Sequence, residues 1–330
     1  MPPSPRRKLA LGGLYIALAA GIFSTLEILL KHPAVAGTFH PLQITMERFL
    51  VGGLCLIPAA VHNLKVKGAV LSRSDLGYLA LIGLLNIPLG MVLFQMSITH
   101  GQANIISVIF SGNPIFIALL AVPILHEKLH WNNVVAFLFQ ILGIIAVMNP
   151  FGGQNLQRSS ILLALASAFC FSLYSVLGKK KNAQLGVFTV ICACFLFGAG
   201  ELTVLMLLGH TGFGAAFYHS LGLDLFCHVP FFQGLNTPAL PYFLIIGIVN
   251  SAAGYVFHML AIETTSAACG SLTFVIKPIL APLLAWLILG EIITLPIGLG
   301  ILFFLSGGLF GIVPEILRTR TQPPLHTLNP

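Results

Sequence analysis

Charged residues are scarce in this chain of 330 residues. Only 8% of the residues are Asp, Glu, Lys or Arg, whereas 57% are hydrophobic and the mean hydropathy is +0.97. So few charges cannot solvate the surface of a globular protein of this length. Many apolar runs are long enough to cross a bilayer, so the sequence predicts an integral membrane protein in contact with lipid and leaves no room for a soluble domain.

Cysteine is also sparse, and its placement excludes a disulfide framework. Five of the six cysteines lie inside apolar runs, where cysteine behaves as a small hydrophobic residue, and only Cys227 lies in an expected loop. The formal net charge of +7 would suit nucleic acid. The basic residues, however, form short clusters between apolar segments, as membrane topology requires. We therefore expect neither a nucleic-acid partner nor a cofactor.

The apolar runs predict an all-α protein with ten transmembrane helices, because about 20 residues are needed for one crossing. The expected spans are residues 9–30, 42–62, 76–98, 103–125, 131–149, 159–179, 186–208, 240–262, 266–289 and 294–314. Cytoplasmic loops collect Lys and Arg. With the N-terminus inside, most of the 16 basic residues fall on the cytoplasmic side. We expect cytoplasmic tails at 1–8 and 315–330 and a location in the cytoplasmic (inner) membrane.

One stretch occurs twice. Ser107–Glu127 (SVIFSGNPIFIALLAVPILHE) returns as Ser271–Glu291 (SLTFVIKPILAPLLAWLILGE), and earlier spans echo each other at Phe23/Phe171 and Lys31/Lys179. Such self-similarity predicts two five-helix repeats, at 9–149 and 159–314, joined by an exterior linker at 150–158. An odd number of spans in each half makes them inverted-topology repeats. The longer exterior loop, about 209–239, is an insertion whose aromatic residues suit the bilayer interface or a lid.

This pattern resembles the EamA type of the drug/metabolite transporter superfamily. The matching residues are Pro114 with Glu127, Pro278 with Glu291, Lys31 at the end of the first helix, and Pro41 with Arg48 around the second. The resemblance implies gradient-linked or exchange-type movement of small solutes, often export of amino acids, metabolites or toxic compounds. Protons or another ion are the implied coupling partner, and the oligomeric state is left open.

Each copy of the repeated stretch contains a proline that we expect to interrupt its helix, Pro114 in one copy and Pro278 in the other. Paired interruptions in two halves of a membrane protein point to a transporter's binding site. The residue before the proline is Asn113 in the first copy and Lys277 in the second. Lys277 is the sharpest candidate for substrate contact, because a lysine at mid-membrane is costly. The alternative is a lysine paired with a glutamate purely for packing.

Other ionisable residues inside spans are candidates for coupling or binding. Glu27 is either a proton-coupling carboxylate or the partner of Lys31 one helical turn later. Arg48 is either an anchor beside Glu47 or a clamp for an anionic group of the cargo. Glu201 has no basic residue near it in the sequence, and a coupling role is open for it.

Neutral polar residues complete the candidate site. Asn86 and Asn250 occupy equivalent repeat positions, where they either join helices by hydrogen bonds or line the cavity. Further candidates for the cavity wall, on position alone, are Asn113, Gln95, Tyr255 and His258.

The segment from His126 to His130 matches the HExxH signature of zinc peptidases. In the second copy only the central Glu291 is kept, so we expect no metal site and no enzyme here. We predict a secondary transporter that moves a small organic solute by alternating access, in the export direction. The alternatives are an intramembrane zinc enzyme that uses His126, Glu127 and His130, and an uncoupled channel or facilitator.

Overall fold

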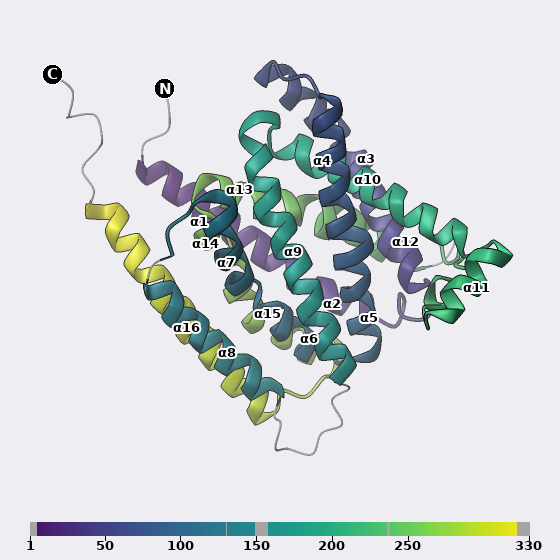
Figure 1. Cartoon of the computed structure of the whole chain (residues 1–330). Coiled ribbons are helices and arrows are strands. Elements are labelled where there is room, and N and C mark those ends of the chain that lie inside the picture. Colours follow the sequence, from purple (N-terminus) through teal and green to yellow (C-terminus); the bar gives the residue numbers. More distant parts are fainter. Residues whose placement is uncertain (1–4, 130, 149–157, 236–237, 322–330) are drawn as a thin grey trace.

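The fold is known from a computed structural model, which describes residues 5–129, 131–148, 158–235 and 238–321. Every regular element in these ranges is a helix (Figure 1). Nearly all of the expected linker 150–158 and part of each expected tail lie outside the described residues. The first helix begins at Pro5 and the last ends at Thr321, so both extend beyond the spans that the sequence predicts.

The helices follow one another in the order of the expected spans. The first half consists of α1 (Pro5–Phe23), α2 (Leu26–Lys31), α3 (Pro41–Lys67), α4 (Arg73–Leu84), the π-helix η1 (Leu85–Met91), α5 (Val92–His100), α6 (Ala103–Phe110), α7 (Asn113–Leu125) and α8 (Trp131–Met148). The second half consists of α9 (Arg158–Leu185), α10 (Val187–Leu208), α11 (Gly212–Ser220), the 3-10 turn η2 (Asp224–Phe226), α12 (Leu240–Leu244), the π-helix η3 (Ile245–Ala253), α13 (Gly254–Thr264), α14 (Ala267–Gly270), α15 (Thr273–Leu289) and α16 (Leu295–Thr321).

Seven helical segments of the described chain are long and apolar enough to cross a membrane, and this makes the protein a multi-pass membrane protein. Three shorter apolar helices stand where further spans are expected, at Trp131–Val147, Thr273–Leu289 and Leu295–Gly311. The count of ten spans stays a prediction.

Local signals explain where individual helices begin and end. His40 precedes α3, its Nδ1 accepts a hydrogen bond from the Leu42 amide, and Gly68 ends the helix at φ 59°. Ser72 and Asp75 form a capping box at the start of α4. These caps fix the register in which α3 and α4 present side chains to the interior.

The two copies of the repeated stretch end in the same way. His126 follows α7 at φ 56° and Gly290 follows α15 at φ 68°, both left-handed conformations. The next amide in each copy, on Glu127 or Glu291, donates to a carbonyl six residues back at 3.3 Å. Such left-handed turns close helix C-termini, and here they place a glutamate directly beyond each helix.

The helix interruptions differ from the sequence prediction in one copy. In the first copy the break is at Ser111–Gly112, and Pro114 stands in the first turn of α7. In the second copy the break is at Ser271–Leu272, and α15 runs through Pro278. The prediction of a break at Pro278 is therefore wrong. Tight turns from Phe274 to Ser271 and from Val275 to Leu272 start the helix early, and a proline inside a membrane helix is tolerated when neighbouring groups surround the freed carbonyl.

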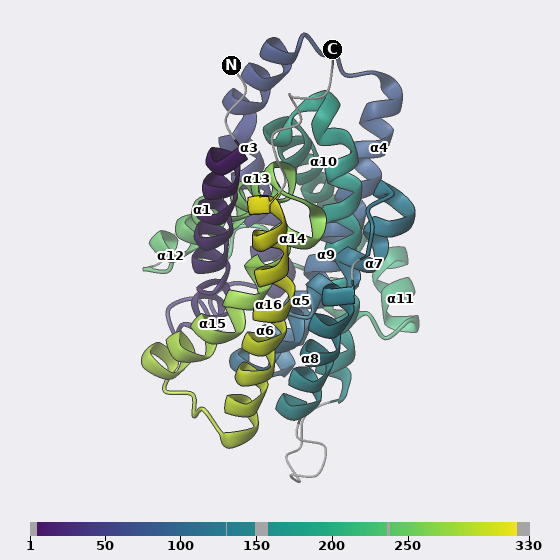
Figure 2. The ribbon, with the colours of Figure 1, turned by 90° about the vertical axis from the view of Figure 1, so that its left-hand side faces the viewer.

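The helices form two packing regions. α8 and α16 lie side by side along one edge of the bundle (Figures 1 and 2), where Gly143 and Gly300 allow the backbones to touch. In the other region α3 packs along α10, and α9 packs against α5, α6 and α7. α1 packs against both α13 and α15, so the first helix of one half contacts the other half.

The long loop after α10 is ordered in its described part. It contains α11 and η2, and the Tyr218 hydroxyl donates to the Leu205 carbonyl of α10 at 3.0 Å. Further along, the Gln233 carbonyl accepts from the Gln43 side chain of α3 at 2.9 Å. The loop therefore packs back onto two helices.

Candidate functional site

Glu27 and Lys277 form an ion pair in the interior. The Lys277 ammonium donates to Glu27 Oε1, and the two side chains are 2% and 1% exposed. The ammonium also lies 4.9 Å from the Phe110 ring centroid and 5.6 Å from that of Phe94, where ring faces attract cations. Glu27 and Lys277 come from different halves, so this buried contact joins the two halves.

A break in the first helix positions Glu27. The hydroxyls of Ser24 and Thr25 donate to the carbonyls of Ala20 and Ile22, at 2.6 and 2.8 Å, and the helix restarts at Leu26. Glu27 thus stands in a first helical turn, where free amides favour a carboxylate.

The predicted alternative of a pair between Glu27 and Lys31 is wrong. The Lys31 ammonium instead donates to the Gly101 carbonyl at 2.5 Å, and Glu27 pairs with Lys277.

Four phenylalanines, Phe23, Phe110, Phe171 and Phe274, pack against one another and are called the Phe quartet; Phe110 is the member that lies beside the Lys277 ammonium. Ring centroids of Phe274 lie 5.8, 5.9 and 5.4 Å from those of Phe23, Phe110 and Phe171, and all four side chains are buried. Sequence reasoning missed these residues. The signal was present, because the quartet consists of the two repeat-matched pairs Phe23/Phe171 and Phe110/Phe274.

Two predicted residues extend the aromatic cluster. The His258 ring lies 5.4 Å from Phe171 and 5.2 Å from Phe274, and its Nε2 lies 3.3 Å from the Ser175 hydroxyl. The Tyr255 ring packs on Phe23 at 5.5 Å, and its hydroxyl donates to the Met91 sulfur at 3.2 Å. The structure thus brings Tyr255 and His258 to the Phe quartet.

Arg48 is fully buried beside this cluster. Its guanidinium lies 4.4 Å from the Phe49 ring centroid and interacts electrostatically with Tyr255 and Glu27. Its three nitrogens have no hydrogen-bond partner in the described part of the chain. In the described part of the chain no ion pair joins Arg48 to its neighbour Glu47, whose Oε1 accepts from the Gln43 amide at 3.1 Å. The choice between an anchor and a clamp for Arg48 stays a prediction.

Three further polar candidates, Asn250, Asn113 and Gln95, each lie in a different environment. Asn250 donates to the Ile22 carbonyl at 2.6 Å and thereby joins helices. Asn113 accepts from the Ser172 hydroxyl at 3.3 Å. Gln95 on α5 is buried, and its Oε1 has no partner among the described residues.

Glu201 lies elsewhere, partly buried on α10. Within the described residues it contacts neither Lys277 nor Arg48. The structure therefore does not bring this carboxylate to the other charges.

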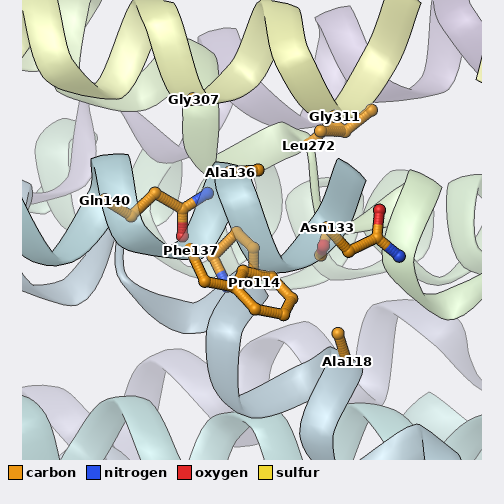
Figure 3. Close-up of a pocket in the computed structure, with 10 residues that line it drawn as sticks. Pro114, Ala118, Asn133, Ala136, Phe137, Gln140, Leu272, Gly307 and Gly311 are labelled. Atoms are coloured by element: carbon orange, nitrogen blue, oxygen red, sulfur yellow. The ribbon is translucent and has the colours of Figure 1, made fainter. Parts of the chain in front are cut away.

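A small pocket lies apart from these charges, between α7, α8 and α16 (Figure 3). Its volume is about 20 Å³, and its wall includes Pro114, Gln140 and Gly307. That is room for about one water molecule and not for an organic solute. The rings of the Phe quartet are buried and pack against one another in the interior.

Two charge interactions connect the halves toward the ends of the bundle, the Lys179–Glu127 ion pair and the electrostatic interaction of Lys31 with Glu291. The Lys179 ammonium binds Glu127 at 2.6 Å, and the Glu127 carboxylate also accepts from the Ala267 amide at 3.2 Å. Lys31, the repeat equivalent of Lys179, contacts Gly101 and interacts electrostatically with Glu291.

These two contacts lie at opposite ends of one span. Gly101 precedes α6 and Glu127 follows α7, and α9 runs between the two ends (Figure 1). The clusters formed by Glu127 with Lys179 and by Lys31 with Glu291 are called the Glu127 end contact and the Glu291 end contact.

The surroundings of the HExxH segment differ from those of a zinc site. Residues 126–129 are not helical, and Glu127 is engaged by Lys179 and Ala267. His130 lies outside the described residues. Among the described residues no three His, Cys, Asp or Glu side chains are grouped as metal ligands.

A helical chain with several membrane-spanning segments and a charged, aromatic interior is typical of membrane transporters. Comparison with known families agrees: the model of the EamA-like transporter family matches residues 10–149 and 158–312. The chain belongs to this family, and it is a membrane transporter.

Relatives with curated names are also transporters. An uncharacterized transporter of Clostridium kluyveri is 35% identical over 304 residues, which is 90% of this chain and 92% of the relative. A probable terminal-alkyne amino-acid exporter of Streptantibioticus cattleyicolor is 26% identical over 86% of this chain and 89% of the relative. An S-adenosylmethionine uptake transporter of Rickettsia prowazekii is 25% identical over 43% of this chain and 46% of the relative.

A solved crystal structure has the same fold. It aligns with a TM-score of 0.66 at 16% sequence identity, over 94% of this chain and 99% of the other.

Proposed function

We propose that this protein is a secondary transporter that exports a small organic solute, such as an amino acid or a related metabolite, by alternating access. The observation that carries the proposal is the buried Glu27–Lys277 pair, whose ammonium lies 4.9 Å from the ring centroid of Phe110 in the Phe quartet. An intramembrane charge pair is expensive, and such pairs mark substrate and ion pathways. Here the pair also joins the two halves that must move relative to each other.

The proposed architecture is ten helices in two inverted five-helix repeats. Three observations support it. The family model matches two segments of similar length. The π-helices η1 and η3 contain the equivalent residues Asn86 and Asn250. The left-handed residues His126 and Gly290 also occupy equivalent positions.

The end contacts suit alternating access. The Glu127 end contact holds α9 to the turn after α7 and to the start of α14, and the Glu291 end contact lies at the opposite end. If one contact opens while the other stays closed, the centre is exposed to one side at a time. We assign the Glu127 end contact to the cytoplasmic side of the inner membrane, because the basic clusters gather there.

Coupling is assigned to Glu27. Its carboxylate is buried and paired, so a proton on it would abolish the attraction that holds Lys277. The released lysine would then allow the Phe quartet to separate. Export is favoured because a relative that is named an exporter aligns over most of its length. A relative that is named an uptake transporter aligns over less than half of its length.

The test is flux through purified protein in proteoliposomes, with a panel of amino acids and aromatic metabolites. Saturable flux and counterflow are expected for the wild type. Lys277→Ala should abolish them while the protein stays inserted, whereas Lys180→Ala, at an exposed position of α9, should not. Unsaturable flux would identify a channel, metal-dependent hydrolysis would identify an enzyme, and full flux in Lys277→Ala would remove Lys277 from the site.

A further inference from the structure

Arg48 carries a buried charge that makes no hydrogen bond in the described part of the protein. A guanidinium has five N–H donors and keeps its proton. Burying it without acceptors is costly, and proteins keep such costs mainly at functional sites. The donors of Arg48 are thus available to an acceptor that arrives with the cargo.

The charges near Arg48 favour an acceptor with a single negative charge. Glu27 pairs with Lys277, and Arg48 interacts electrostatically with the same Glu27. One carboxylate therefore faces two cations, which leaves one positive charge. A bound monoanion would bring the net charge of this group to zero. A dianion would make the net charge negative, and a cation would raise it to two positive charges.

The neighbours of Arg48 supply one more polar group and several rings. Tyr255 interacts with Arg48, and the Asn86 amide lies next to the Tyr255 hydroxyl. The rings of Phe49, Phe195 and Tyr255 pack with centroids 4.8 to 5.6 Å apart.

Two unusual helical segments flank this group. Asn86 lies in the π-helix η1. Tyr255 is the second residue of α13, the helix that directly follows the π-helix η3. Wide π-turns occur frequently at functional sites. Both halves therefore contribute irregular helix to the surroundings of Arg48.

We propose that Arg48 binds the carboxylate of the transported solute, and that the cargo is a monocarboxylate with an apolar body. This inference rests on the proposed transport function. The guanidinium fork matches a carboxylate in two-point geometry, the Asn86 amide supplies a further donor, and the rings pack against the body of the solute.

The experiment uses four probes that share a phenyl ring and differ in the charge of the head group: 3-phenylpropionate, 3-phenylpropanamide, phenethylamine and phenyl phosphate. Each is added to purified full-length protein, and the thermal unfolding midpoint and the saturable flux in proteoliposomes are measured. Ligands that bind the folded state raise the midpoint. The expected result is protection and flux with 3-phenylpropionate, with little effect of the amide, the amine or the phosphate.

Three variants assign this binding to Arg48. Arg48→Met should weaken 3-phenylpropionate binding by about 10- to 100-fold, which is the effect of losing hydrogen bonds to a charged group. Arg48→Lys should recover part of the affinity, because it keeps the charge but not the fork. The exposed Arg158→Met is the matched control and should bind as the wild type does.

A readout without ligand separates binding from a structural role. Arg48→Met removes an unsatisfied buried charge, so its unfolding midpoint should rise above that of the wild type. A lower midpoint would show that Arg48 holds the fold together, and the inference would be wrong. Equal protection by the amine or the amide, preference for the phosphate, or protection by none of the four probes would also overturn it. The transport proposal is judged separately, because saturable flux of any solute supports it even when Arg48→Met has no effect.

Discussion

Glu27 Oε1 accepts a hydrogen bond from Lys277 Nζ, and this ion pair connects α2 with α15 across 250 positions of sequence. Both side chains are buried, so water cannot hydrate either charge if the pair is broken. Breaking a buried pair by removing one partner is strongly destabilising, whereas replacing both partners by apolar groups is often neutral. This asymmetry separates a structural role from a transport role.

Lys277→Met and Glu27→Leu should each lower the free energy of unfolding by about 3–5 kcal/mol, because each leaves one buried charge unpaired. The double variant should recover most of this loss. All three should lack saturable flux. Thermal unfolding and proteoliposome flux check the prediction, with Lys180→Met as the exposed control. A double variant that recovers stability and also transports would reduce the pair to a packing element.

Substitutions at the two end contacts should open opposite ends of the protein. Glu127→Gln weakens the ion pair with Lys179 and the bond to the Ala267 amide, and Glu291→Gln weakens the equivalent interaction with Lys31. Partly exposed ion pairs contribute about 0.2–1 kcal/mol, so the population of the opened end should change by about 1.4- to fivefold.

Hydrogen exchange would detect this opening. In Glu127→Gln the amides of α14 should exchange faster, and in Glu291→Gln the amides of α6 should do so. Faster exchange of the same helix in both variants would contradict separate gates.

Stability should depend on pH through His40. Its Nδ1 accepts the Leu42 amide at the start of α3, outside the membrane-spanning segments, and burial lowers the pKa of His40 below its usual 6.5. The unfolded chain then binds the proton more readily than the folded one. This contribution is complete above pH 6.5 and is lost as the pH falls through the lower, folded pKa.

His40→Asn tests this dependence, because asparagine caps a helix without titrating. Unfolding midpoints at pH 7.5 and 5.5 should fall less in this variant than in the wild type. Equal falls in the two proteins would exclude His40 as the titrating group.

The inverted topology is tested by labelling. Single cysteines at Arg73, Lys180 and Arg158, all exposed positions, are introduced into a cysteine-free background and treated with a membrane-impermeant maleimide. In intact cells only position 158 should react, while 73 and 180 should react after permeabilisation. Labelling of 73 and 180 from opposite sides would contradict the inverted repeat.

Much of this fold follows from the sequence alone, because apolar length and repetition are local properties. The helices, the glutamates that follow α7 and α15, and the position of Lys277 inside the protein could all be predicted. The partner of Lys277 could not, because spacing favoured Lys31 for Glu27 and no local pattern reports a contact with α15.

The Phe quartet was missed for a different reason. Phenylalanine is equally favourable in contact with lipid and inside a membrane protein, so the count of 25 does not indicate which of them are buried in the interior. Only the pairing of Phe23 with Phe171, and of Phe110 with Phe274, distinguished these four from the others. The break at Ser271–Leu272 was also missed, because a proline is the visible interruption and a tight turn upstream of it is not.

The wide turns of η3 determine which way the following helix faces. One residue more or less rotates every later side chain on a helix by about 100°. Tyr255 and His258 follow η3 and point toward the phenylalanines of the interior. Shortening η3 by one residue would make the helix more regular, but it would turn this tyrosine and this histidine away from the phenylalanines, so the irregular winding determines where they point.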